Sequence, residues 1–147
     1  MNLTEKINAD IKNAMLAKEK ETLDALRAIK AGILLAKSSG EPVTDESELK
    51  MLQKMVKQRR ESAEIYKTQN RDDLVKIELD QAAIIETYLP AQMNQEDITI
   101  IVKRIISQTG AASAKDMGKV MGMASKELAG KADNKIVSTI VKELLNS

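Results

Sequence analysis

The chain has 147 residues, of which 43% are hydrophobic, which is enough for one ordinary domain or two small ones with a packed core. Cysteine and histidine are both absent, so disulfides and thiol chemistry are excluded, and the commonest general base and metal ligand is missing. The formal net charge of +1 excludes a module that binds nucleic acid through bulk positive charge, so any RNA contact has to be local.

The composition favours helices throughout. Aromatic residues are limited to Tyr66 and Tyr88, so the core has to be built from aliphatic residues, methionine and alanine, which pack well between helices. No apolar run approaches the ~20 residues of a membrane span, and the first residues lack the apolar stretch of a signal peptide. The sequence therefore predicts a cytoplasmic protein without a membrane segment.

Four helices are predicted in the first half of the chain, because apolar residues recur there at steps of three and four. The pattern slips at residues 18–21, and residues 38–42 form the clearest loop. Asp45 and Glu48 have capping-box spacing for the third helix, and Asn70 can cap the fourth. The first helix is expected to begin at Asn2 or Leu3. The second is expected to begin before Leu23 and to end near Lys37, and the third to run from near Asp45 to near Gln69. The fourth is expected to begin after Asn70 and to end near Leu89. The residues expected on their buried faces are Leu3, Ile7, Ile11, Met15, Leu23, Leu26, Ile29, Ile33, Leu34, Leu49, Leu52, Val56, Ala63, Leu74, Ile77, Ile84, Ile85 and Leu89.

The dipeptide Leu89-Pro90 marks the predicted domain boundary, because the residue before a proline is pushed out of helical geometry. Three further helices are expected after it. The first starts after Asn94 and has Gly110 as its C-terminal cap, and the last is capped by Asp133.

The middle helix of this second half is expected to end at Gly130, and Ser113 and Asp116 have capping-box spacing for its start. The β-branched runs at 98–101 and 136–141 could be read as strands, but their spacing and caps favour helix. The expected fold is all-α, with an N-terminal four-helix domain over 1–89 and a C-terminal three-helix bundle over 90–147.

Two glycine-containing segments stand out in the second half, Asp116-Met117-Gly118-Lys119-Val120-Met121-Gly122 and Gly130-Lys131-Ala132-Asp133. Each glycine inside a helix costs roughly 1 kcal/mol relative to alanine, so Gly118 and Gly122 call for a close neighbour. One interpretation, which we favour, is tight packing against the helix before or after. The other is the close approach of RNA or of a protein partner to Gly118, Gly122 and Gly130, and the two are compatible if different faces are used.

The lysines beside these glycines are candidates for phosphate contact: Lys119, Lys126, Lys131 and Lys135. Lys119 and Lys126 are seven residues apart and share a helix face. Lys131 precedes a helix N-terminus, whose free N–H groups could join it in holding an anion, although Asp133 is expected to cap the same helix. Ordinary solvation of each lysine is the alternative and the more common situation.

These segments carry a resemblance to a known family. Together with Leu89-Pro90-Ala91-Gln92, Arg59-Arg60-Glu61-Ser62 with Tyr66, and Arg71-Asp72-Asp73-Leu74, they resemble the YqeY-like family over essentially the whole chain. The second half is similar to the tail domain of the B subunit of glutamine-dependent aspartyl/glutamyl-tRNA amidotransferase, which carries a similar Gly-x-Val-Met helix and Gly-Lys-Ala turn. One departure is Asn134, where family members often have glycine; asparagine also tolerates left-handed geometry.

The resemblance implies an all-helical two-part fold and a tail that touches the body of tRNA, and it implies no catalysis. We therefore expect a non-catalytic tRNA-associated protein without a cofactor or metal, accessory to or derived from the amidotransferase system. The alternative is a protein-interaction adaptor that uses the long helices of the first half. Less expected is a carbon–nitrogen ligase with glutamine as amido donor that acts as part of a complex, because the chain has no trace of an ATP site or an ammonia source.

Overall fold

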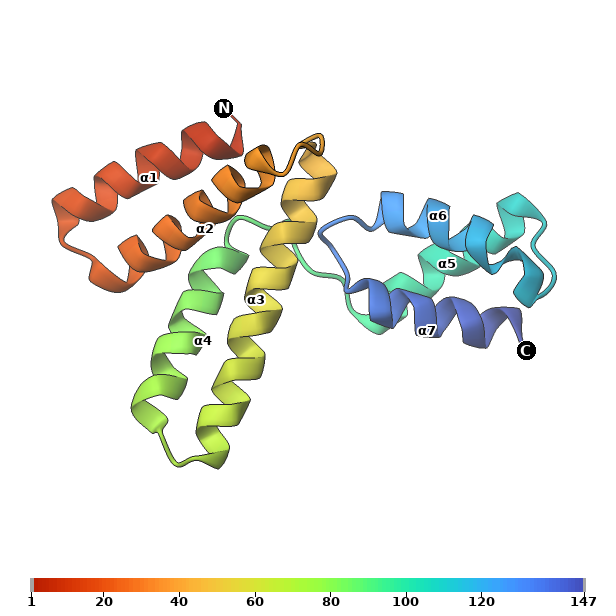
Figure 1. Cartoon of the computed structure of the whole chain (residues 1–147). Helices are drawn as coiled ribbons and strands as arrows, with labels where there is room; N and C mark the ends of the chain where they lie inside the picture. Colours follow the sequence, from red (N-terminus) through yellow and green to blue (C-terminus); the bar gives the residue numbers. More distant parts are fainter. Residues whose placement is uncertain (1, 147) are drawn as a thin grey trace. The chain divides into compact units, whose positions relative to one another are not determined.

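A computed structural model describes residues 2–146 (Figure 1). Within this range the chain forms seven α-helices and one short 3₁₀ helix, with no strand, so the prediction of an all-α fold is confirmed. The two β-branched runs are helical, as their spacing indicated. The elements are α1 (Leu3–Ala17), α2 (Lys20–Ser38), α3 (Asp45–Thr68), α4 (Asp72–Glu86), α5 (Gln95–Thr109), η1 (Ala114–Asp116), α6 (Met117–Glu127) and α7 (Asn134–Leu145).

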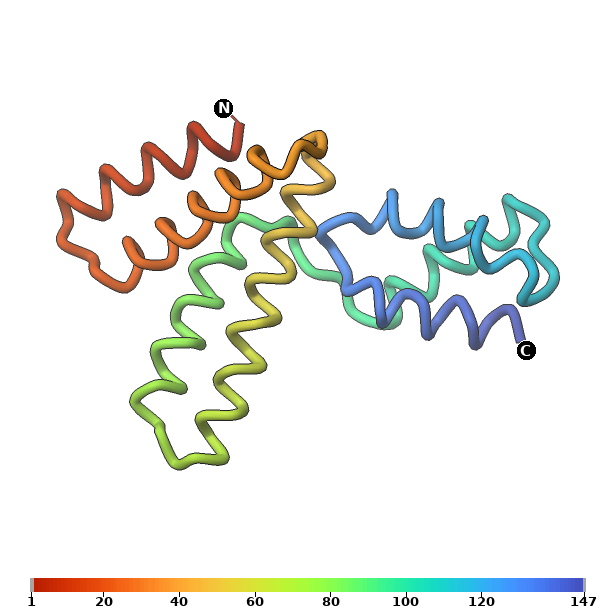
Figure 2. Tube along the Cα trace, viewed as in Figure 1, coloured from red at the N-terminus to blue at the C-terminus, as the bar shows by residue number. Residues whose placement is uncertain are grey.

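The helices divide into two compact units, and the division lies between Leu89 and Pro90. Helices α1 to α4 belong to the first unit, and α5, η1, α6 and α7 belong to the second. In the first unit α3 and α4 run side by side as a long antiparallel hairpin, and α1 and α2 form a second hairpin (Figure 2).

The helix caps of the first unit lie close to their predicted positions but use different residues. The capping box of α3 is formed by Thr44 and Ser47, one residue before the predicted pair, and Ser47 N–H donates to Thr44 Oγ1 at 3.1 Å. Asn70 does not cap α4. It adopts a left-handed conformation with φ of 57°, which asparagine tolerates well, and it closes the turn between α3 and α4.

The core of the first unit joins its four helices, and Leu26, Ile29, Leu52 and Ile85 are fully buried in it. Three residues expected in this core are instead substantially exposed: Met15 (55%), Leu34 (55%) and Ile77 (39%). The reason for Met15 is geometrical. Each step of four residues turns a helix about 40° past a full turn, so the row that starts at Leu3 has drifted away from the core before it reaches Met15.

The outer part of the α3–α4 hairpin, residues 57–81, is called the arm below. Ala63 is the one buried residue within it, and this residue is not part of the core cluster. Ile65 and Leu79 are 57% and 46% exposed. Polar contacts cross the hairpin near its base, where Arg59 Nε donates to Gln81 Oε1 at 3.1 Å. The arm is thus held together with little apolar burial.

Tyr88 connects the end of the α4 segment to α1. Its hydroxyl donates to Asp10 Oδ2 at 2.5 Å, and Lys6 Nζ lies 5.6 Å from the centre of its ring. Partial burial, followed by the bond to Asp10, raises the pKa of the Tyr88 phenol. The phenol therefore stays protonated and continues to donate.

The second unit has its own core, in which Val102, Ile105, Val120, Val137 and Val141 are completely buried. Helix α5 begins after Asn94 and is ended by Gly110, as predicted. Asn94 Oδ1 accepts from Asp97 N–H at 2.8 Å, and Gly110 ends the helix with φ of 70°. The capping box predicted from Ser113 and Asp116 does not form. Ser113 instead caps the 3₁₀ helix η1, and the Asp116 carboxylate accepts from Ala112 N–H at 3.0 Å.

Candidate nucleic-acid interface

The outer face of α6 collects four of the seven residues singled out from the sequence. Val120, Ala124 and Leu128 point into the core. With 3.6 residues per turn, the opposite side of the helix is formed by Gly118, Lys119, Gly122 and Lys126, all of which are exposed.

The two glycines on this face touch no other helix. A Cβ atom added at Gly118 or Gly122 meets nothing within 4 Å, so the interpretation as tight packing against a neighbouring helix is wrong. The packing of α6 on α5 and α7 instead uses its other side, through Val120 and Ala124. No contact among the described residues offsets the cost of these two glycines in a helix.

The charge on the outer face of α6 is positive. Both carboxylates of this segment are engaged elsewhere: Asp116 accepts from Ala112, and Glu127 forms an ion pair with Arg104 of α5. Lys119 and Lys126 are left as the charged groups of the face.

Sequence reasoning missed Lys115, which is exposed in η1. It precedes Lys119 by four residues, and the series Lys115, Lys119, Gly122 and Lys126 has the spacing of a single helix face. That spacing was the available signal. The predicted cap at Ser113 already places Lys115 in the first turn of the same helix.

The Gly130-Lys131 turn has a structural explanation for its glycine. Gly130 is buried and has a φ of 75°, a conformation that side-chain-bearing residues avoid. Its carbonyl accepts from Gln92 Nε2 at 2.7 Å, and the Lys131 carbonyl accepts from Met93 N–H at 2.9 Å. Gly130 therefore shapes the turn and offers no surface to a ligand, whereas the Lys131 side chain is exposed.

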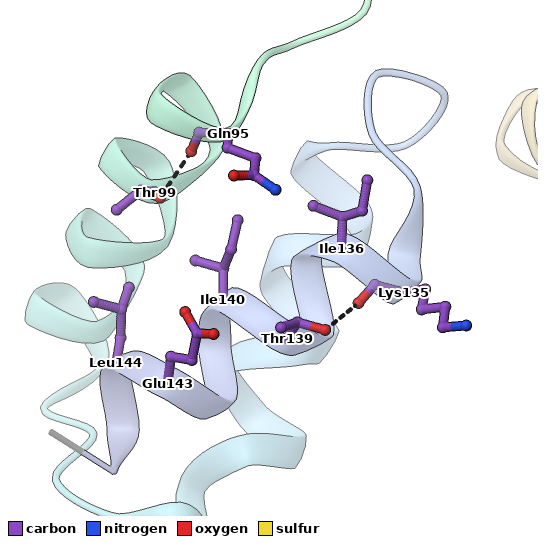
Figure 3. Close-up of a pocket in the computed structure, with 8 residues that line it drawn as sticks. All are labelled: Gln95, Thr99, Lys135, Ile136, Thr139, Ile140, Glu143 and Leu144. Carbon is purple, nitrogen blue, oxygen red and sulfur yellow. Dashed lines mark hydrogen bonds between the residues drawn. The ribbon is translucent and has the colours of Figure 1, made fainter.

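Lys135 lies apart from the α6 face. It lines a groove of about 400 Å³ between α5 and α7, together with Gln95, Thr99 and Glu143 among others (Figure 3). As predicted, Asp133 caps α7, and its carboxylate accepts from Lys135 N–H at 2.9 Å. The acidic cap occupies the position that an anion would need. Asn134 is the first residue of α7, so it does not require the left-handed geometry considered for it.

The described residues contain no group of three or more acidic, histidine or cysteine side chains arranged to hold a metal ion. On α4, Asp80 pairs with Lys76 at 2.9 Å and Glu86 pairs with Arg60. Among the helices of residues 2–146, none combines the length and apolar character that crossing a membrane requires.

Three similar proteins bear the name altered inheritance of mitochondria protein 41, mitochondrial. The protein from Pyrenophora tritici-repentis is 32% identical over 97% of this chain and 80% of its own length. The protein from Meyerozyma guilliermondii is 34% identical over 82% of this chain and 65% of its own length. The protein from Clavispora lusitaniae is 36% identical over 64% of this chain and 57% of its own length. The predicted cytoplasmic location is contradicted by this comparison, because all three relatives are named as mitochondrial proteins.

A protein-family model described as Yqey-like protein matches residues 4–145, which is nearly the whole chain. The family predicted from the segments at 89–92, 116–121 and 130–133 is thus confirmed, and the chain belongs to the YqeY-like family.

Proposed function

We propose that this chain is a non-catalytic tRNA-associated protein whose second unit docks on structured tRNA through the outer face of α6. The observation that carries the proposal is the combination on that face of two glycines with open space above them and exposed lysines with no free carboxylate beside them. Lys119 and Lys126 would contact phosphate, with Lys115 at one end and Lys131 beyond the other.

The chemistry of this face fits a double-helical backbone better than unpaired bases. Lysine binds phosphate as a point charge, and a glycine surface allows a sugar–phosphate chain to approach the helix closely. Both aromatic residues, Tyr66 and Tyr88, precede residue 90, so the second unit has no ring on which a base can stack. The face would therefore read the shape and phosphates of a folded RNA.

The choice of tRNA rests on the sequence resemblance of the second half to the tail domain of the amidotransferase B subunit. A role as an accessory to that system is part of the proposal. Any ligase activity would require other subunits to supply the ATP site and the ammonia source, of which the sequence has no trace.

The test is fluorescence anisotropy of labelled bulk tRNA with the purified full chain at low and moderate salt, with double-stranded DNA as the comparison. We expect salt-sensitive binding to tRNA and weaker binding to DNA. Lys119→Ala combined with Lys126→Ala should raise Kd and reduce the slope of log Kd against log salt by about 1 to 2.

The matched control combines Lys103→Ala with Lys142→Ala, two exposed lysines on α5 and α7 of the same unit. Both double variants lose two positive charges, so a loss that depends only on net charge affects them equally. Equal losses, or no tRNA binding even at low salt, would refute the assignment of the α6 face.

A second candidate function is a protein-interaction adaptor, and the arm favours it. Ile65, Ile77 and Leu79 are exposed there, while Ala63 alone is buried. Binding of a protein partner through these exposed apolar side chains would change little with salt, in contrast to phosphate binding. An Ile65→Ser/Leu79→Ser variant that loses a partner while tRNA binding is unchanged would separate the two functions.

A further inference from the structure

The groove between α5 and α7 is bordered by two parallel rows of α7 side chains (Figure 3). The row nearer to α5 is apolar and consists of Ile136, Ile140 and Leu144. The second row consists of Lys135, Thr139 and Glu143. Each row repeats at four residues, so both rows form one continuous face of the helix.

The apolar row is only partly covered within the unit. Ile136 is 39% exposed and Leu144 is half-buried, whereas Ile140 between them is buried at the bottom of the row, and between these side chains and α5 lies the groove of about 400 Å³. A row of apolar side chains at the bottom of an open groove gains stability when another helix fills it.

The polar row has opposite charges at its two ends. Lys135 and Glu143 are both exposed, and neither forms an ion pair within residues 2–146. They lie eight residues apart on α7, or about 12 Å, which is too far for them to pair with each other. Each side chain is therefore available to an external charge.

The arrangement of these six residues is self-complementary under two-fold rotation. When a second α7 is laid antiparallel, with the axis near Thr139 and Ile140, Lys135 faces Glu143 of the partner subunit and Glu143 faces the partner's Lys135. In the same register Ile136 faces Leu144 of the partner subunit, and Ile140 faces the partner's Ile140. A two-fold interface requires a patch that complements itself in this way.

We propose that this face of α7 and the adjoining groove are the site at which a second copy of this chain binds. The charge pattern favours a copy of the same face over an unrelated helix. In a single antiparallel register, two Lys135–Glu143 pairs form between the copies and the two apolar rows face each other. The outer face of α6 lies on another helix and is not part of this interface, so the inference does not depend on tRNA binding.

The test is sedimentation velocity on the full chain over a range of concentrations. The unmodified chain should shift with concentration from a mass of 16.2 kDa towards twice that value. Lys135→Glu and Glu143→Lys each place like charges opposite one another at two positions, and each should raise the dissociation constant of the dimer by at least about tenfold.

The double variant Lys135→Glu/Glu143→Lys restores opposite charges across the interface and should dimerise again. A mixture of the two single variants should form a mixed dimer, because one copy then carries two acidic and the other two basic side chains. Folding is preserved in all of them, since Lys135→Glu adds an acid to the first turn of α7 and Glu143→Lys adds a base to the last turn, both favourable to the helix dipole.

A chain that stays at 16.2 kDa at every concentration overturns the proposal. A dimer that is insensitive to both single charge reversals also overturns it, as does a double variant that fails to recover dimer formation while circular dichroism shows intact helices. In those cases the groove either takes a helix of another protein or is not an interface.

Discussion

Replacing Gly122 by alanine should make the second unit more stable. Gly122 is the sixth of the eleven residues of α6, has a helical backbone, and has open space where the Cβ atom would lie. Alanine at such a position loses less conformational entropy on folding and meets no obstacle. The expected gain in the free energy of unfolding is about 1 kcal/mol.

Gly118 should give a smaller gain. It is also exposed and unobstructed, but it is the second residue of α6, where fewer backbone hydrogen bonds depend on its conformation. We expect about 0.5 kcal/mol for Gly118→Ala. Gly130→Ala is the control of opposite sign. With a φ of 75° at Gly130, alanine is strained there and should cost about 1 to 2 kcal/mol.

The assay is urea unfolding of the full chain, monitored by hydrogen-exchange mass spectrometry on peptides from α6, so that the second unit is measured by itself. A loss of stability in Gly122→Ala would refute the placement of this residue on an open face, because it would mean that a neighbouring group fills the space above it.

The same variant separates folding from binding. If tRNA approaches the α6 backbone at Gly122, the alanine methyl group should weaken tRNA binding while the protein becomes more stable. Unchanged affinity in the Gly122→Ala variant would remove the glycines from the proposed interface and leave only the lysines.

Three further outcomes are expected. The pKa of Tyr88 is raised above its usual value of 10.0, so the folded chain keeps a proton that the unfolded chain releases. Urea titrations should therefore show a free energy of unfolding that falls as the pH rises past 10. Tyr88→Phe should remove this part of the pH dependence. Arg104→Gln breaks an exposed ion pair and should cost less than about 1 kcal/mol, yet it frees the Glu127 carboxylate beside the α6 face and should raise Kd for tRNA in the anisotropy assay. Asp133→Ala removes the cap of α7 and should cost about 1 kcal/mol in urea unfolding, whereas Asp133→Asn should retain most of the stability.

The helices and their ends could be read from the sequence where the signal is local. Asn94, Gly110 and Asp133 act within three or four residues of their own position, and all three cap helices as predicted. The prediction that Asn70 caps α4 is wrong because the same residue type serves both as an N-cap and as a left-handed turn residue, and the choice depends on how α3 and α4 meet.

Contacts between distant residues could not be read from the sequence. Nothing near Tyr88 indicates that its partner is Asp10, 78 residues earlier. The openness above Gly118 and Gly122 is likewise a property of packing, since the same glycine pair separated by four residues is typical of tight helix contacts. The position of Lys135 in the α5–α7 groove, away from Lys119 and Lys126, depends on how three helices assemble.

The unequal burial along α3 divides one continuous helix into two segments of different stability. Its first half contributes Leu52 and Val56 to the core, and its second half, in the arm, buries only Ala63. The arm can therefore open by local unfolding that begins at the turn around Asn70 and stops near residue 57, while the core remains folded. A protease that cuts at this turn would find its substrate in the native ensemble at a free energy well below that of global unfolding. The tip of the hairpin is thus the place where the first unit should be nicked first, and the place where an inserted peptide should be tolerated best.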